Sequence, residues 1–167
     1  KKVADHIVTL NHLHDFNSQA LANIIYAYSK AQETHLDLFN KVADHIVTLN
    51  HLNDFQPQNL SNIVWSYEKA SVSHPGLFDK VADHIVTRQH LNDFKPQELS
   101  NILNAYAKAE VSHPDLYEKV ADHIVTLDNL NSYDEQALAN IIWSYAKAGV
   151  SHYLLFNRVA DHIVTLT

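Results

Sequence analysis

The strongest constraint on the fold is a segment that recurs along the chain at a fixed spacing of 39 residues. The segment Lys-Val-Ala-Asp-His-Ile-Val-Thr begins at Lys2, Lys41, Lys80 and Lys119, and it returns with arginine in first position at Arg158. A fixed period of this length is typical of arrays in which each repeat packs only on its neighbours. We therefore expect one helical-repeat array over residues 1–167, with repeats at approximately 2–40, 41–79, 80–118 and 119–157 and a terminal half-repeat at the C-terminus.

Each repeat has the pattern of two amphipathic helices. In the second copy, Leu60, Ile63, Val64 and Tyr67 fall at the i, i+3, i+4 and i+7 positions of one helical face, which predicts a helix over about 57–71. Pro57 suits its first turn, and Asn17 and Asp134 occupy the preceding capping position in other copies. A second helix is predicted over about 75–90, with apolar residues around roughly half of its circumference.

One such helix pair cannot bury the apolar faces of both of its helices, so neighbouring pairs must stack. The fold class that follows is all-α, an α-solenoid superhelix of the right-handed type, built from tandem antiparallel helix pairs with a 39-residue repeat. Nine helices are expected, and the series starts and ends with the second helix of a repeat. Two glycines and four prolines in 167 residues leave few turn-forming residues for a many-stranded sheet, which also favours helix.

The sequence gives no basis for catalysis, metal binding or membrane insertion. Cysteine is absent, and we find no paired nucleophile and base, no phosphate-binding glycine loop and no apolar run of about 18 residues. Asp-His pairs recur in every copy, but adjacent helical residues diverge by about 100°, so we predict no metal site there. Lys80 and Asp83 are predicted to form a solvated pair, and His35, His74, His113 and His152 to act as cap or turn residues. We expect a soluble protein without a cofactor that is not an enzyme.

A file of polar and aromatic residues lies opposite the apolar stripe of the first helix of each repeat. In the second copy it comprises Gln58, Asn62, Trp65 and Lys69, at i, i+4, i+7 and i+11. Aromatic rings stack on bases, amides read base edges and lysine meets phosphate, so these files are candidate contacts for single-stranded RNA. The equivalent files in the other copies are Gln19, Asn23, Tyr26 and Lys30; Gln97, Asn101, Asn104 and Lys108; and Gln136, Asn140, Trp143 and Lys147.

A structural interpretation of the same residues stays open. Trp65 and Trp143 could pack into the groove between repeats, and the recurring asparagines could tie neighbouring helices together. Asn104 favours an open site, because a core position does not readily exchange tryptophan for asparagine.

The string from Phe55 to Ala70 (FQPQNLSNIVWSYEKA), followed by His74-Pro75-Gly76-Leu77-Phe78, resembles octotricopeptide repeats. These are helical-hairpin repeats of algal and other organellar proteins, and the resemblance covers essentially the whole chain. It implies sequence-selective, non-catalytic binding of RNA by the first helices, in the processing, stability or translation of transcripts in a chloroplast or mitochondrion. Asn104, where the family usually has tryptophan, departs from the pattern.

Charge favours a different partner. The formal net charge is −7, the wrong sign for a protein that holds nucleic acid by a broad basic field, although thirteen histidines make this balance depend on pH. The alternative is therefore a scaffold solenoid that binds a protein partner, including a consensus or designed repeat array. The exposed ends of such an array could also associate end to end.

Overall fold

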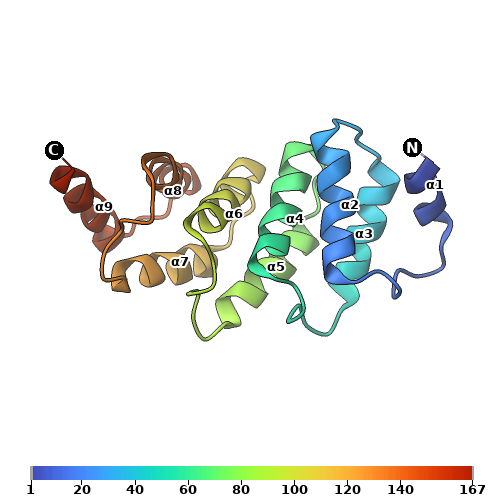
Figure 1. Cartoon of the computed structure of the whole chain (residues 1–167), viewed down its shortest axis with the longest axis horizontal. Coiled ribbons are helices and arrows are strands. Elements are labelled where there is room, and N and C mark those ends of the chain that lie inside the picture. Colours follow the sequence, from blue (N-terminus) through green and yellow to red (C-terminus); the bar gives the residue numbers. More distant parts are fainter. Residues whose placement is uncertain (1, 167) are drawn as a thin grey trace. The chain divides into compact units, whose positions relative to one another are not determined.

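The computed structural model describes residues 2–166, which form nine α-helices and no strand (Figure 1). The first helices of the repeats, here called the A helices, are α2 (Ser18–Lys30), α4 (Pro57–Lys69), α6 (Pro96–Ala109) and α8 (Glu135–Ala148). The second helices, called the B helices, are α1 (Lys2–Thr9), α3 (Leu36–Thr48), α5 (Pro75–Thr87), α7 (Pro114–Thr126) and α9 (Tyr153–Thr165). The predicted all-helical class and the series of nine helices that begins and ends with a B helix are confirmed.

The chain divides into two compact units, Lys1–His84 and Ile85–Thr167, with the boundary inside α5. In the first unit α2 packs along α4, and α1 packs against α3. In the second unit α6 packs along α8, and α7 packs against α9. Within each unit, A helices therefore lie beside A helices and B helices beside B helices.

Polar side chains fix where the helices begin, as the sequence predicts. The side chains of Asn17 and Asp134 each accept a hydrogen bond of 2.7 Å from the backbone N–H three residues on, and α4 begins at Pro57. Four B helices are capped by histidine instead. The Nδ1 atom accepts from the backbone N–H three residues further on, at 3.0–3.2 Å, in His35, His74, His113 and His152.

Within each unit, a tyrosine of an A helix contacts a neighbouring B helix. Tyr67 packs edge-on against Phe39, and its hydroxyl donates to the Phe39 carbonyl at 2.6 Å. In the second unit Tyr145 packs edge-on against Tyr117 and donates to the Tyr117 carbonyl at 2.6 Å. Burial, as the largest cause, raises the pKa of both hydroxyls far above its ordinary value, so both remain protonated donors at neutral pH.

Lys80, predicted to lie in solvent beside Asp83, is instead half-buried. Its Nζ donates to the carbonyl of Leu49, just past the C-terminus of the preceding B helix. Lys41, Lys119 and Arg158 make the same contact one repeat apart, to the carbonyls of Leu10, Arg88 and Leu127. Each of these cations donates to a carbonyl group at the negative end of a helix dipole. Because the cation is partly buried there, this contact stabilises the fold more than an exposed ion pair would.

Candidate nucleic-acid interface

In the first unit, the predicted files of α2 and α4 lie side by side. The rings of Tyr26 and Trp65 have centroids 5.5 Å apart and are tilted by 39°. The Nζ of Lys30 lies 5.9 Å from the centroid of the Trp65 ring, within range of a cation–π contact. Both rings are half-buried, so each packs on one side and keeps ring surface accessible to solvent.

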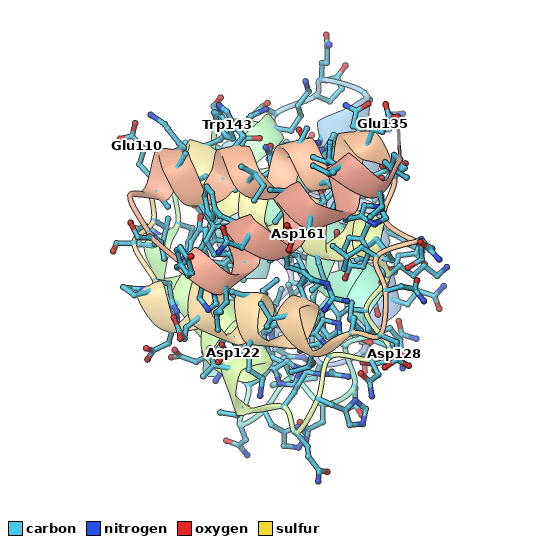
Figure 2. All side chains as sticks on the ribbon, turned by 90° about the vertical axis from the view of Figure 1, so that its left-hand side faces the viewer. Glu110, Asp122, Asp128, Glu135, Trp143 and Asp161 are labelled. Carbon is cyan, nitrogen blue, oxygen red and sulfur yellow. The ribbon has the colours of Figure 1, made fainter. Side chains whose placement is uncertain are left out.

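In the second unit, the same positions differ in chemistry. Trp143 of α8 is 43% exposed, whereas α6 offers the half-buried Asn104 in place of a ring. The Gln97 side chain donates to the Asn101 side chain at 3.1 Å, and the Nζ of Lys147 lies 3.7 Å from a carboxylate oxygen of Glu110. Trp143 lies on the side of α8 turned away from α9 (Figure 2).

None of the sixteen predicted contact residues is buried. All four glutamines and all four lysines of the files are exposed, as is Asn23, while Asn62, Asn101 and Asn140 are half-exposed. Their accessibility follows from the helical geometry, because residues opposite the apolar stripe must face away from the core. Trp65, Asn104 and Trp143 are thus not sealed inside the core, and the files remain candidate contact surfaces within each unit.

The negative charge of the chain is not spread evenly between the two kinds of helix. The four A helices together carry four lysines and three acidic residues. The five B helices carry nine acidic residues against five basic ones, and four of those basic side chains are turned to backbone carbonyls. The objection from net charge therefore applies to the B helices much more than to the A helices.

Aspartates of the recurring Asp-His pairs contact the capping histidine of the following repeat, which the sequence analysis missed. The capping histidine of one B helix places its Nε2 against the aspartate of the preceding B helix, at 3.0 Å for His35 and Asp5 and 2.8 Å for His74 and Asp44. Since Nδ1 already accepts a backbone hydrogen bond, the neutral ring carries its proton on Nε2 and donates to the carboxylate. The constant separation of 30 residues was the signal in the sequence.

Within the described part of the chain, one group of side chains has the composition of a metal site. It contains Glu118, Asp122 and His152, whose ligand atoms lie within 4.8 Å of one another. His152 Nδ1, however, accepts from the Leu155 backbone N–H, so the Nε2 that faces the carboxylates carries the proton rather than a lone pair. The group has the geometry of the other histidine caps, and a metal would have to break that cap.

No model of a known protein family matches the chain, and neither does any curated protein. None of the helices in residues 2–166 is long and apolar enough to cross a membrane.

Proposed function

We propose that this chain is a non-catalytic helical-repeat protein that binds single-stranded RNA through the outer faces of its A helices. The observation that carries this proposal is the cluster of Tyr26, Trp65 and Lys30, in which two partly open rings and a cation share one surface. The pairs of A helices continue as a solenoid superhelix with a 39-residue repeat, similar to octotricopeptide repeats. On that resemblance, the RNA is an organellar transcript.

The chemistry of the files favours unpaired over paired RNA. A half-exposed ring can stack on a base only where that base has left its own stack, and such stacking contributes about 1–3 kcal/mol per base. The exposed glutamine and the asparagine one turn along the helix can reach the edges of a splayed base. The lysine at the end of each file is placed for a phosphate.

Binding to a randomised pool of single-stranded RNA at low salt tests the proposal. Replacing the four file lysines with alanine should weaken binding at least tenfold and flatten its dependence on salt, because phosphate contacts release counterions. Alanine favours helix, so the fold should be kept. The substituted residues are Lys30, Lys69, Lys108 and Lys147.

A control variant should change net charge equally but outside the A helices. Four exposed amides that follow B helices serve this purpose in the changes Asn50→Asp, Asn53→Asp, Gln89→Glu and Asn92→Asp. Both variants lower the formal charge by four, so binding by the files predicts a much larger loss for the lysine variant. Equal losses would show that only net charge matters, and no binding of the unchanged chain to the pool would reject the proposal.

The acidic B helices favour a second candidate, a scaffold for a basic protein partner. Asp44 is 75% exposed and Asp122 is 64% exposed in their side chains, even though each lies near a histidine. A basic partner recovered with the chain after nuclease treatment would support this candidate, as would its loss when these aspartates are changed to asparagine.

A further inference from the structure

The two terminal B helices show which side of a B helix faces which neighbour. In α1, which has no B helix before it in the described chain, Ala4 and Ile7 are buried but Val3 is 59% exposed. In α9, which has none after it in residues 2–166, Val159 is buried but Ile163 is 50% exposed. The valine edge therefore faces the preceding repeat, and the alanine and isoleucine edge faces the following one.

The A helices have the same polarity. In α2 Ile24 is half-exposed and Ile25 is buried. In α8 the pattern is reversed, because Ile141, the equivalent of Ile24, is buried and Ile142, the equivalent of Ile25, is half-exposed. The equivalents of Ile142 in the three earlier copies, Ile25, Val64 and Leu103, are all fully buried. In the described residues, the first and last helix pairs thus each present an apolar face of a kind that is buried at equivalent positions in the other copies.

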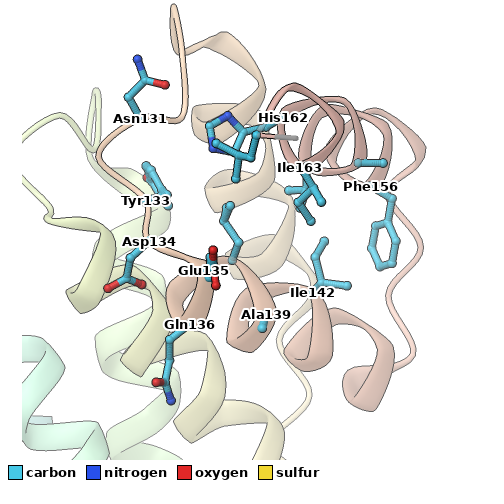
Figure 3. Close-up of a pocket in the computed structure, with 14 residues that line it drawn as sticks. Asn131, Tyr133, Asp134, Glu135, Gln136, Ala139, Ile142, Phe156, His162 and Ile163 are labelled. Atoms are coloured by element: carbon cyan, nitrogen blue, oxygen red, sulfur yellow. The ribbon is translucent and has the colours of Figure 1, made fainter.

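The face at the C-terminal end is a groove between α8 and α9 with a volume of about 1200 Å³. Ile142 of α8 and Phe156 and Ile163 of α9 line it, together with Ala160 (Figure 3). Residues equivalent to Phe156 are at most 1% exposed at Phe39, Phe78 and Tyr117. The groove therefore has the same kind of apolar lining that is buried at the equivalent positions of the earlier copies.

A polar contact also links the start of each B helix to the end of the preceding one. Each B helix from α3 onward has a cation near its start that donates to the carbonyl group just after the preceding B helix, as Lys41 does to Leu10. Lys2 is the equivalent cation of α1 and is exposed, and Leu166 is the equivalent of Leu10 at the end of α9. A second copy would bring a cation of the right type to that carbonyl.

We propose that the C-terminal face of one copy binds the N-terminal face of a second copy, head to tail, with α1 taking the position of the next B helix beside α9. Val3 then covers Ala160 and Ile163, and Lys2 bonds the carbonyl of Leu166. The contact is heterologous, so it propagates into chains or rings. The contact joins one B helix, α1, to one B helix, α9, so it belongs to the small, weak class of interfaces.

Two variants of the full chain test this arrangement by sedimentation equilibrium at roughly 10 µM to 1 mM, the range in which weak interfaces form. Val3→Asp places a charge on the N-terminal face, and Ile163→Asp places one on the C-terminal face. Both positions are exposed, so circular dichroism should show unchanged helix content. The unchanged chain should rise above its monomer mass of 19.0 kDa with concentration, whereas each variant alone should not. An equimolar mixture should stop at dimers, because it offers one intact face of each kind.

The matched control is Leu36→Asp, since Leu36 and its equivalents Pro75, Pro114 and Tyr153 are exposed in every copy and lie on neither end face. It should associate like the unchanged chain. Loss of association in Ile163→Asp but not in Val3→Asp would show a symmetric contact between two C-terminal faces and overturn the proposal. A chain that stays at monomer mass throughout this range would overturn it too.

Discussion

At the scale of single residues, the capping histidine connects the start of its own B helix to the repeat before it. His74 Nδ1 accepts from the Leu77 backbone N–H at 3.0 Å, and its Nε2 donates to Asp44 at 2.8 Å. The two contacts differ in value, because an N-cap contributes about 1 kcal/mol and a pair with an exposed carboxylate contributes little. The histidine should therefore stabilise the chain mainly as a cap.

Two substitutions of His74 separate these contacts. His74→Ala removes both and should lower the free energy of unfolding by about 1 kcal/mol, whereas His74→Asn keeps a capping oxygen and should cost only a few tenths. Urea unfolding followed by circular dichroism measures both values. Equal losses in the two variants would instead assign the stability to the contact with Asp44.

At the scale of the helix, the end of every A helix requires a backbone conformation that few residue types adopt easily. The residue after each A helix or its cap has a positive φ, close to 58° at Gln32, Ser71 and Glu110 and 71° at Gly149. A residue with a side chain is strained by about 1–2 kcal/mol in this left-handed region, and glycine is not. Only the last of the four copies therefore has the residue that best suits the turn.

Ser71→Gly should raise the free energy of unfolding by about 0.5–1 kcal/mol, since relief of backbone strain exceeds the extra entropy that glycine gives to the unfolded chain. The reverse change, Gly149→Ala, should lower it by about 1 kcal/mol, even though no atom lies within 4 Å of the added methyl group. Thermal unfolding of both variants checks the pair. A lower midpoint for Ser71→Gly would show that the serine contributes a contact that outweighs its strain.

At this scale, the sequence could predict the features that depend on residues close together in the chain. The start of α4 at Pro57 and the caps at Asn17 and Asp134 are local, and the exposure of Trp143 follows from its place opposite the apolar stripe. The partner of Lys80 lies in the preceding repeat, and the approach of Tyr26 to Trp65 depends on how α2 packs along α4. Such contacts between repeats are set by packing, which helical periodicity does not specify.

At the scale of the whole molecule, each unit contains a histidine whose charged form is disfavoured. Burial is the main cause that lowers the pKa of His45 below 6.5, and the nearby His14 and His12 add repulsion. Burial likewise lowers the pKa of His123 in the second unit, with repulsion from His90. The ring of His14 lies 5.5 Å from that of His45, so a proton on either ring repels a proton on the other.

Mild acid should therefore destabilise the whole chain while it strengthens RNA binding. Below pH 6.5 the unfolded chain binds protons at His45 and His123 that the folded chain does not, so stability is full above that pH and falls as the pH drops from 6.5 through the lower folded values. Urea midpoints at about pH 7.5 and about pH 5.5, on either side of the ordinary histidine pKa, measure the loss. The double variant His45→Gln and His123→Gln should show a smaller loss of stability, and an equal loss would refute this assignment.

Affinity for RNA should rise as the pH falls, in the opposite direction to stability, since protonation of the exposed members of the thirteen histidines makes the surface more positive. A partner held instead by the acidic B helices would bind more weakly at the lower pH, so the sign of the change distinguishes the two proposed partners.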